Sequence, residues 1–184
     1  KNHLFSGLSF NSFNCKKNYI FFAIKGSNFN GNKFIEHAIK KGARTVVSNN
    51  KYEGIKNNVL FIKSSNVRKS LAEIVNQIYK KKPTNLIAVT GTNGKSSIAN
   101  FYLQLLKLNK KKVASIGTLG VHANSKKIEL QNTTLDPLQL AKYLTQLKKQ
   151  NINNVILEAS SHGLKQSRLD GLKFKTGIFT NLSH

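Results

Sequence analysis

Several residue types are scarce in this chain of 184 residues, and each shortage excludes a class of protein. The single cysteine, Cys15, excludes an intramolecular disulfide framework and fits a reducing compartment, so we expect a cytoplasmic protein. Cys15 also lacks the His and Cys partners of a zinc site. No apolar run approaches the roughly 20 residues that a membrane-spanning helix needs, and no secretory leader is visible. We therefore expect no membrane partner.

Acidic residues are the other shortage: 7 Asp and Glu stand against 30 Lys and Arg, for a net charge of +23. Such a balance raises the suspicion of a basic nucleic-acid-binding module, which stays open as an alternative. However, the lysines scatter over every predicted element, and no aromatic residues interleave them as platforms for bases. Lys, Asn, Ile and Phe have AT-rich codons, so their abundance favours compositional drift. We expect no specific nucleic-acid partner.

A strand, a glycine loop and a helix are predicted in this order between residues 86 and 108. Leu86–Val89 is a short apolar run, and Ile98, Phe101, Leu105 and Leu108 recur at helical spacing. This order surrounds a bound anion with backbone N–H groups and a helix N-terminus. The lysine can reach the outer phosphates of a nucleotide, and the serine after it can ligate Mg²⁺. The candidate ATP-binding residues are Gly91, Thr92, Asn93, Gly94, Lys95, Ser96 and Ser97.

The general P-loop pattern is not met, because Val89 stands where that pattern has its first glycine. A glycine-rich turn before a helix is the alternative interpretation. The strand before the loop, the GKS sequence and the helix after it favour a nucleotide site.

Alternating strands and helices predict an α/β protein of two domains. Residues 80–84, with a lysine run and Pro83, read as a linker, so we expect domains at 1–82 and 83–184. The first is predicted to be a small N-terminal α/β domain, and the second the first part of a doubly wound, mostly parallel sheet of the P-loop ATPase type. Residues 1–18 read as polar and turn-rich. Strands are expected at 19–24, 45–48, 59–62, 86–90, 112–116, 154–158 and 176–180, and helices at 34–42, 67–79, 96–108 and 138–149.

Glu158 is one of the few acids, and it follows four apolar residues at the end of a predicted strand. The carboxyl ends of parallel strands share one edge, so Glu158 is expected near Ser96. Mg²⁺ prefers hard oxygen ligands, which makes Ser96 and Glu158 the candidate metal ligands; a solvated glutamate is the alternative. His162, after Ser160 and Ser161, lacks the surroundings of a nucleophile pair and is interpreted as a loop histidine with local hydrogen bonds.

Both ends suggest a piece of a longer protein. Lys1 stands where a start methionine would be expected, and the last strand runs directly into the C-terminus. Ligands bind at that end of parallel strands, so we expect further chain there.

Four motifs in order, TGTNGKS, NTTLDP, LEASSHGLKQSRLDG and FTNLS, resemble those of the Mur ligases, and within that family the MurE type. The N-terminal half is similar to the family's uridine-binding domain through FNS, YIFFAIKG and GSNFNGNKFI. The resemblance covers nearly the whole chain. It implies an ATP- and Mg²⁺-dependent amide ligase of peptidoglycan precursor synthesis, which adds diaminopimelate or lysine to UDP-MurNAc-L-Ala-D-Glu through an acyl phosphate. The sequence does not give the oligomeric state, and we expect a monomer.

The resemblance also assigns roles by position. Lys95 and Glu158 are the candidate catalytic residues, because phosphoryl transfer needs the terminal phosphate to be positioned and its charge neutralised, and this agrees with the activity that the resemblance implies. The positions that match contacts to the UDP-muramoyl-dipeptide are Asn132, Thr133, Thr134, Ser160, Gln166 and Arg168. The positions that match uridine-nucleotide contacts are Phe10, Ser12, Ser27, Asn28 and Phe29, for which ordinary turn chemistry is the alternative.

Departures from the family pattern limit what we expect. Asn11 stands for the usual Asp, Phe13 for Arg and Leu135 for Pro. The family's later metal-binding His, carbamylated Lys and C-terminal domain have no counterpart here, so we expect that the chain alone does not complete catalysis. A folylpolyglutamate synthase is a related alternative, although that family favours a glycine where Ser96 stands. A non-catalytic remnant of a split or decayed gene is another.

Overall fold

The computed structural model describes residues 4–26, 29–123, 126–128 and 134–183. The chain forms two compact units, Lys1–Leu71 and Ala72–His184, which are here called the N-terminal and C-terminal units. The division falls within helix α2 (Val67–Ile78), whereas the sequence suggested a boundary between residues 82 and 83. That boundary stays a prediction.

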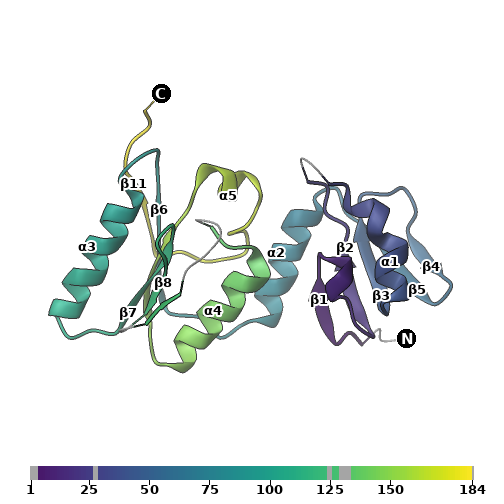
Figure 1. Cartoon of the computed structure of the whole chain (residues 1–184), viewed down its shortest axis with the longest axis horizontal. Coiled ribbons are helices and arrows are strands. Elements are labelled where there is room, and N and C mark those ends of the chain that lie inside the picture. The colour runs from purple at the N-terminus through teal and green to yellow at the C-terminus, as the bar shows by residue number, and fades with distance from the viewer. Residues whose placement is uncertain (1–3, 27–28, 124–125, 129–133, 184) are drawn as a thin grey trace. The chain divides into compact units, whose positions relative to one another are not determined.

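The N-terminal unit is built on a five-stranded sheet in the order β1-β2-β3-β5-β4 (Figure 1). Its neighbouring strands run parallel except β4, which is antiparallel to β5. Phe21, Phe22, Val46 and Val47 are all at most 2% exposed, as expected for apolar runs in strands that are covered on both faces. The strands are β1 (Gly7–Ser9), β2 (Tyr19–Phe22), β3 (Ala43–Ser48), β4 (Gly54–Lys56) and β5 (Val59–Lys63).

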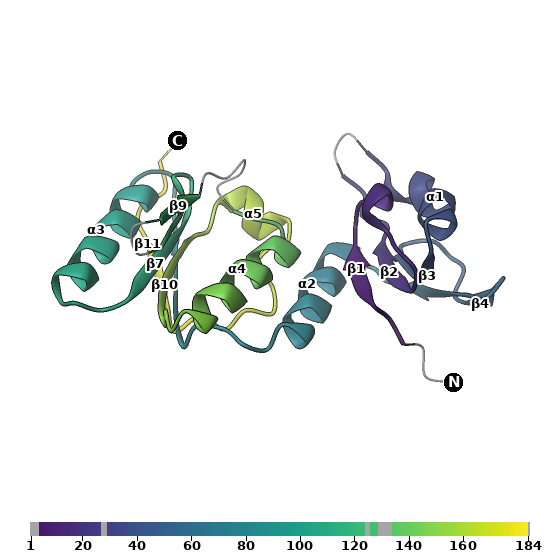
Figure 2. The ribbon, with the colours of Figure 1, turned by 60° about the horizontal axis from the view of Figure 1, so that its bottom comes forward.

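Short helices cover this sheet: η1 (Ser12–Asn14), η2 (Gly31–Phe34) and α1 (Ile35–Lys40). Helix α1 lies beside β3 and buries Ile35 and Ala38 (Figure 2). Residues 1–18 were predicted to be turn-rich, and this prediction missed the strand β1 and the short 3₁₀ helix η1. Three-residue elements are too short to show a period, and β1 owes its place to parallel pairing with β2.

The C-terminal unit contains a six-stranded sheet in the order β11-β6-β10-β7-β8-β9. The first four strands in this order are parallel, and β8 and β9 extend the sheet in antiparallel fashion. The mostly parallel α/β sheet is therefore confirmed, while the antiparallel hairpins of β4, β8 and β9 were not predicted. The strands are β6 (Asn85–Thr90), β7 (Val113–Gly117), β8 (Gly120–Ala123), β9 (Lys126–Ile128), β10 (Asn154–Glu158) and β11 (Thr176–Phe179).

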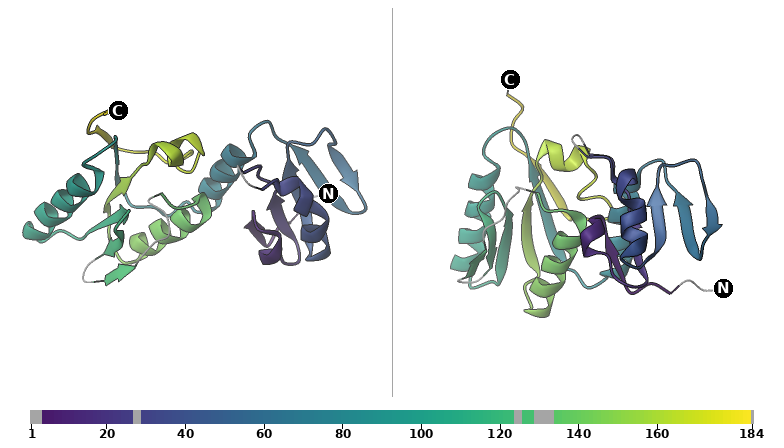
Figure 3. Two further views of the ribbon diagram at one scale, coloured as in Figure 1. Left: turned by 45° about the horizontal axis from the view of Figure 1, so that its top comes forward. Right: turned by 45° about the vertical axis from the view of Figure 1, so that its right-hand side comes forward.

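Helices α3 (Lys95–Leu108) and α4 (Pro137–Lys149) lie on opposite faces of this sheet in both views of Figure 3. Helix α4 buries Leu140, Leu144 and Leu147 in one core. Asp136 caps α4, since its Oδ1 accepts from the amides of Leu138 (2.9 Å) and Gln139 (3.0 Å). A short helix, α5 (Ser161–Lys165), follows β10 where the sequence suggested a loop.

Helix α3 was predicted from the spacing of Ile98, Phe101, Leu105 and Leu108, yet among these four only Ile98 packs against the core. Phe101, Leu105 and Leu108 are 59%, 60% and 80% exposed. Ala99 and Leu103 are the buried positions, and Ala99 packs on Val89 and Ile156 in the sheet. A small residue allows close approach of helix and sheet, which periodicity of large apolar residues does not reveal. None of the helices in the described ranges has the length and apolar character of a membrane span.

Candidate functional site

The glycine loop joins β6 to α3 in left-handed backbone that glycine adopts without strain. Gly91 has φ 133° and Gly94 has φ 82°. Gly94 is the N-cap of α3, and no side chain caps this helix. The first amides of α3 therefore face the loop without a side-chain acceptor, as in sites that receive an anion.

The end of β11 ties down this loop. The Thr92 amide donates to the Asn181 carbonyl (2.9 Å), and the Thr180 hydroxyl donates to the Asn93 carbonyl (2.6 Å). A Cβ on Gly91 would lie 2.1 Å from the Thr180 hydroxyl oxygen, so the close approach also requires glycine. Thr180 and Asn181 were not among the predicted site residues. The signal for them was a polar pair directly after the last strand, at the same edge as the loop.

Lys95 lies back across the loop. Its Nζ donates to the carbonyl oxygens of Gly91 (2.6 Å) and Thr92 (2.8 Å). Phosphate oxygens accept from an ammonium group more strongly than carbonyls do, because they are charged. The uncapped amides and this ammonium group fit the phosphates of a nucleotide. Thr92, Asn93 and Ser97 are exposed on the loop and the first turn.

Glu158 ends β10 and is only 4% exposed. Its Oε2 accepts from the hydroxyls of Ser96 (2.9 Å) and Thr118 (3.0 Å). A Cβ on Gly117 would lie 2.2 Å from Glu158 Oε1, so glycine is needed beside the carboxylate. Ser96 and Glu158, the two predicted metal ligands, are thus brought together. Thr118 was missed; it follows β7 at the same strand edge.

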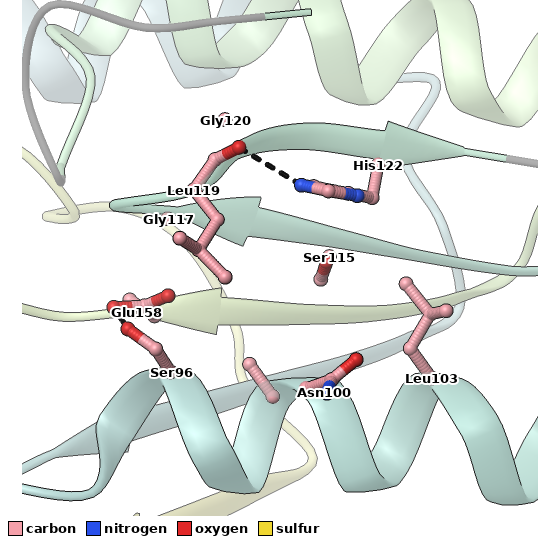
Figure 4. A pocket seen from close by; sticks show the side chains of 10 residues that line it. Ser96, Asn100, Leu103, Ser115, Gly117, Leu119, Gly120, His122 and Glu158 are labelled. Carbon is pink, nitrogen blue, oxygen red and sulfur yellow. Dashed lines mark hydrogen bonds between the residues drawn. The ribbon is translucent and has the colours of Figure 1, made fainter. Parts of the chain in front are cut away.

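A pocket opens beside Glu158 between α3, β7 and β8 (Figure 4). Ser96 points from α3 toward Glu158, and the His122 ring turns toward the Leu119 carbonyl, with 2.8 Å between Nε2 and the oxygen. Within the described part of the chain, no three His, Cys, Asp or Glu residues gather as metal ligands. One carboxylate with two hydroxyls offers hard oxygens, which fit Mg²⁺ that takes its other ligands from phosphate and water.

Thr134 connects Glu158 to a second cluster. The Thr134 hydroxyl lies 3.1 Å from the Glu158 carbonyl oxygen, and it accepts from the Ser160 amide (3.1 Å). Ser160 in turn caps α5, because its Oγ accepts from the Gly163 amide (3.0 Å). Thr134 is buried, and a Cβ on Gly163 would approach its Cβ to 2.7 Å. Ser160 therefore starts α5 and is fixed by Thr134 at the same time.

Arg168 completes this second cluster. Its Nε and Nη2 both donate to Gln166 Oε1, at 3.1 and 2.8 Å, and its Nη1 donates to the Thr134 carbonyl. The predicted substrate residues Thr134, Ser160, Gln166 and Arg168 are thus joined in one network. Asn132 and Thr133, also predicted, lie outside the described residues.

Asp136 lies near this network. Burial raises the pKa of its carboxyl group, and this effect exceeds the opposing effects of the two capping amides and of the Arg168 and Lys142 charges. The carboxylate of Asp136 is thus held in a site that disfavours its charge.

The predicted uridine contacts belong to the N-terminal unit. Ser12 is buried, with its Oγ 2.9 Å from His37 Nδ1, while Phe10 and Phe29 are 39% and 72% exposed. Asn11 Oδ1 accepts from the Phe13 amide (2.9 Å), so it caps η1 as an aspartate in its place would. The other two predicted contacts, Ser27 and Asn28, lie outside the described residues.

A parallel sheet with helices on both faces and a glycine loop between β6 and α3 defines an α/β protein with a P-loop-type domain. Two family models match the sequence: "Mur ligase family, catalytic domain" over residues 4–83, and "Mur ligase middle domain" over residues 89–184. The chain therefore belongs to the Mur ligase family, which confirms the resemblance found in its motifs.

Relatives of the chain carry one name. A UDP-N-acetylmuramoyl-L-alanyl-D-glutamate–2,6-diaminopimelate ligase of Rickettsia montanensis is 44% identical over 98% of this chain and 38% of its own length. A second relative, UDP-N-acetylmuramoyl-L-alanyl-D-glutamate–2,6-diaminopimelate ligase 2 of Clostridium acetobutylicum, is 34% identical over 96% of this chain and 38% of its own length. The chain thus spans well under half the length of these relatives.

Solved structures agree with this. The structure of a ligase with the same name matches with a TM-score of 0.82 and 34% identity, over 98% of this chain and 37% of its own. MurF ligase from Thermotoga maritima in complex with ADP matches with a TM-score of 0.55 and 21% identity, over 88% of this chain and 33% of its own, which shows the fold alone.

Proposed function

We propose that this chain carries the nucleotide-binding and muramoyl-dipeptide-binding parts of an ATP-dependent amide ligase that adds diaminopimelate to UDP-MurNAc-L-Ala-D-Glu. The single observation behind this proposal is the double use of Glu158. Its side chain accepts from Ser96 beside the glycine loop, and its backbone carbonyl lies 3.1 Å from the Thr134 hydroxyl of the second cluster. Groups held by the two clusters would therefore meet at one residue.

The glycine loop would hold ATP. Residues 91–97 supply backbone amides to the phosphates, Lys95 supplies an ammonium group for the outer ones, and Ser96 and Glu158 supply oxygens for Mg²⁺. Mg²⁺ bound there would neutralise charge on the phosphates. These groups position the terminal phosphate and stabilise its charge, which is most of what phosphoryl transfer requires of a protein.

The second cluster would hold the acceptor. A guanidinium group pairs with a carboxylate through two parallel hydrogen bonds, so Arg168 suits a carboxylate of the dipeptide. Thr134 and Ser160 offer hydroxyls beside it. A carboxylate held there would take the terminal phosphate of ATP, with ADP as the leaving group, and the incoming amine would then attack the carbonyl of the acyl phosphate and release inorganic phosphate and a proton. The relatives' shared name favours diaminopimelate over lysine as that amine.

Binding to the 184-residue chain tests the proposal without requiring turnover. Calorimetry with UDP-MurNAc-L-Ala-D-Glu and with UDP, each in the presence of MgATP, compares a ligand that reaches the second cluster with one that does not. We expect the dipeptide ligand to bind at least about tenfold more tightly, as expected for a charge-assisted pair. Equal affinities for the two ligands would contradict the proposal.

A further inference from the structure

His162 lies one turn before Gln166, and the two side chains meet. Gln166 Nε2 and His162 Nε2 are 2.5 Å apart. The backbone N–H of Gln166 also donates to the backbone carbonyl of His162 at 3.0 Å, so the last turn of α5 holds the two residues as an i, i+4 pair. His162 was interpreted from the sequence as a histidine with only local bonds. The structure shows that the His162 ring bonds to Gln166, which in turn accepts two hydrogen bonds from Arg168.

Hydrogen-bond chemistry fixes the direction of this contact. A guanidinium group only donates, so the Gln166 atom that faces Arg168 must be the carbonyl Oε1. The other end of the Gln166 amide is then the NH₂ group, which donates. His162 Nε2 must therefore accept, and an imidazole nitrogen accepts only when it carries no proton. This contact therefore requires the tautomer that carries its proton on Nδ1.

The contact between His162 and Gln166 affects how Arg168 is presented to a ligand. The hydrogen bonds of Arg168 to other described residues use three of the five N–H donors of its guanidinium group, two to Gln166 and one to the Thr134 carbonyl, and the other two can serve a ligand. Gln166 accepts two of these three hydrogen bonds from the Arg168 side chain. Loss of the acceptor at His162 removes one of the groups that orient the Gln166 side-chain amide, so Arg168 is held less firmly and a ligand must remove more conformational freedom when it binds.

We propose that His162 is a positioning residue for the substrate carboxylate: its unprotonated Nε2 orients the Gln166 amide, which holds the Arg168 guanidinium ready to pair with that carboxylate. This rests on the proposed function, since the carboxylate is that of the muramoyl dipeptide. It adds a residue of the SSHGL motif that the resemblance did not assign.

Matched variants at position 162 separate an acceptor from a merely structural ring. H162F keeps a planar ring but has no acceptor, whereas H162Q offers a carbonyl oxygen to Gln166. For H162F we expect binding of UDP-MurNAc-L-Ala-D-Glu to the 184-residue chain to weaken about fivefold to tenfold, with UDP and MgATP binding unchanged. H162Q should stay within about twofold of the unchanged chain. Unchanged dipeptide binding by H162F, or equal losses in both variants, would overturn the proposal.

A spectroscopic measurement on the unchanged chain does not depend on how a variant folds. The ¹⁵N chemical shifts of the His162 ring report which nitrogen carries the proton. We expect Nδ1 to be protonated and Nε2 to be bare, and a proton on Nε2 would overturn the proposal. Failure of the proposed function has a different signature, because the unchanged chain would then fail to prefer the dipeptide ligand over UDP.

Discussion

Two clusters at the carboxyl edge of the C-terminal sheet share Glu158 but are built by different means. The glycine loop presents backbone: amides of an uncapped helix, two left-handed glycines and one lysine folded over carbonyls. The Arg168 cluster presents side chains, each oriented by the next through hydrogen bonds. Backbone sites bind by local geometry that the sequence encodes directly, whereas side-chain networks depend on residues that are brought together only by the fold.

Loss of the lysine should give the largest effect, on the loop alone. For K95A we expect MgATP binding to weaken about 10- to 100-fold, because charge-assisted hydrogen bonds to phosphate are lost. Dipeptide affinity measured without nucleotide should not change. Calorimetry checks both, with K107A, on the exposed last turn of α3, as the control for removing a positive charge. If K95A binds MgATP as well as K107A does, the loop is not the ATP site.

A methyl group beside Glu158 should disturb the residue that joins the two clusters. In G117A the new Cβ would lie 2.2 Å from Glu158 Oε1, so the carboxylate must shift from the position in which it accepts from Ser96 and Thr118. We expect the free energy of unfolding to fall by about 1–3 kcal/mol and Mg²⁺-dependent ATP binding to weaken roughly tenfold.

The control for this steric effect is G177A on the edge strand β11, where nothing lies within 4 Å of an added Cβ. Urea denaturation and ATP titrations with and without Mg²⁺ compare the two variants. If G117A and G177A have the same stability and the same Mg²⁺-dependent ATP affinity, the prediction is contradicted, because a shift of the Glu158 carboxylate would then have no effect.

Replacement of the guanidinium should affect the second cluster only. In R168K a single ammonium group cannot reproduce the fork that contacts Gln166 and Thr134. We expect dipeptide affinity to fall about fivefold to tenfold while MgATP affinity stays unchanged. A parallel loss of ATP binding, measured by calorimetry, would mean that the two clusters are coupled more tightly than their shared residue implies.

The same contrast explains what the sequence could predict. The loop, α3, β10 and the pairing of Ser96 with Glu158 follow from glycines, an apolar run and the rule that parallel strands end at one edge. The hydrogen bond of Thr118 to Glu158 and that of Thr180 to the glycine loop could not be found this way, because which strand ends lie side by side depends on the strand order. Short elements such as β1 and α5 carry too few residues for a period.

At Asp136 the capping of α4 can be separated from the effect of the negative charge, because the side chain caps the helix while burial disfavours its charge. Its folded-state pKa is raised by burial above the ordinary value, so between these two values the folded chain binds more protons than the unfolded chain. The free energy of unfolding therefore decreases as the pH rises through this window, which begins at the ordinary pKa of about 3.9. D136N keeps a capping oxygen for Leu138 and Gln139 without the charge.

We expect D136N to equal or slightly exceed the unchanged chain in stability at pH 7, by less than about 1 kcal/mol, and to lack this part of the pH dependence. D136A, which removes the cap as well, should lose about 1 kcal/mol. Urea denaturation of all three chains across pH 4–8 measures the difference. If D136N is less stable than the unchanged chain, and the deficit in its free energy of unfolding is larger at high pH than at low pH, the expected pH dependence is contradicted. Arg168 would then stabilise the Asp136 carboxylate more than burial penalises it.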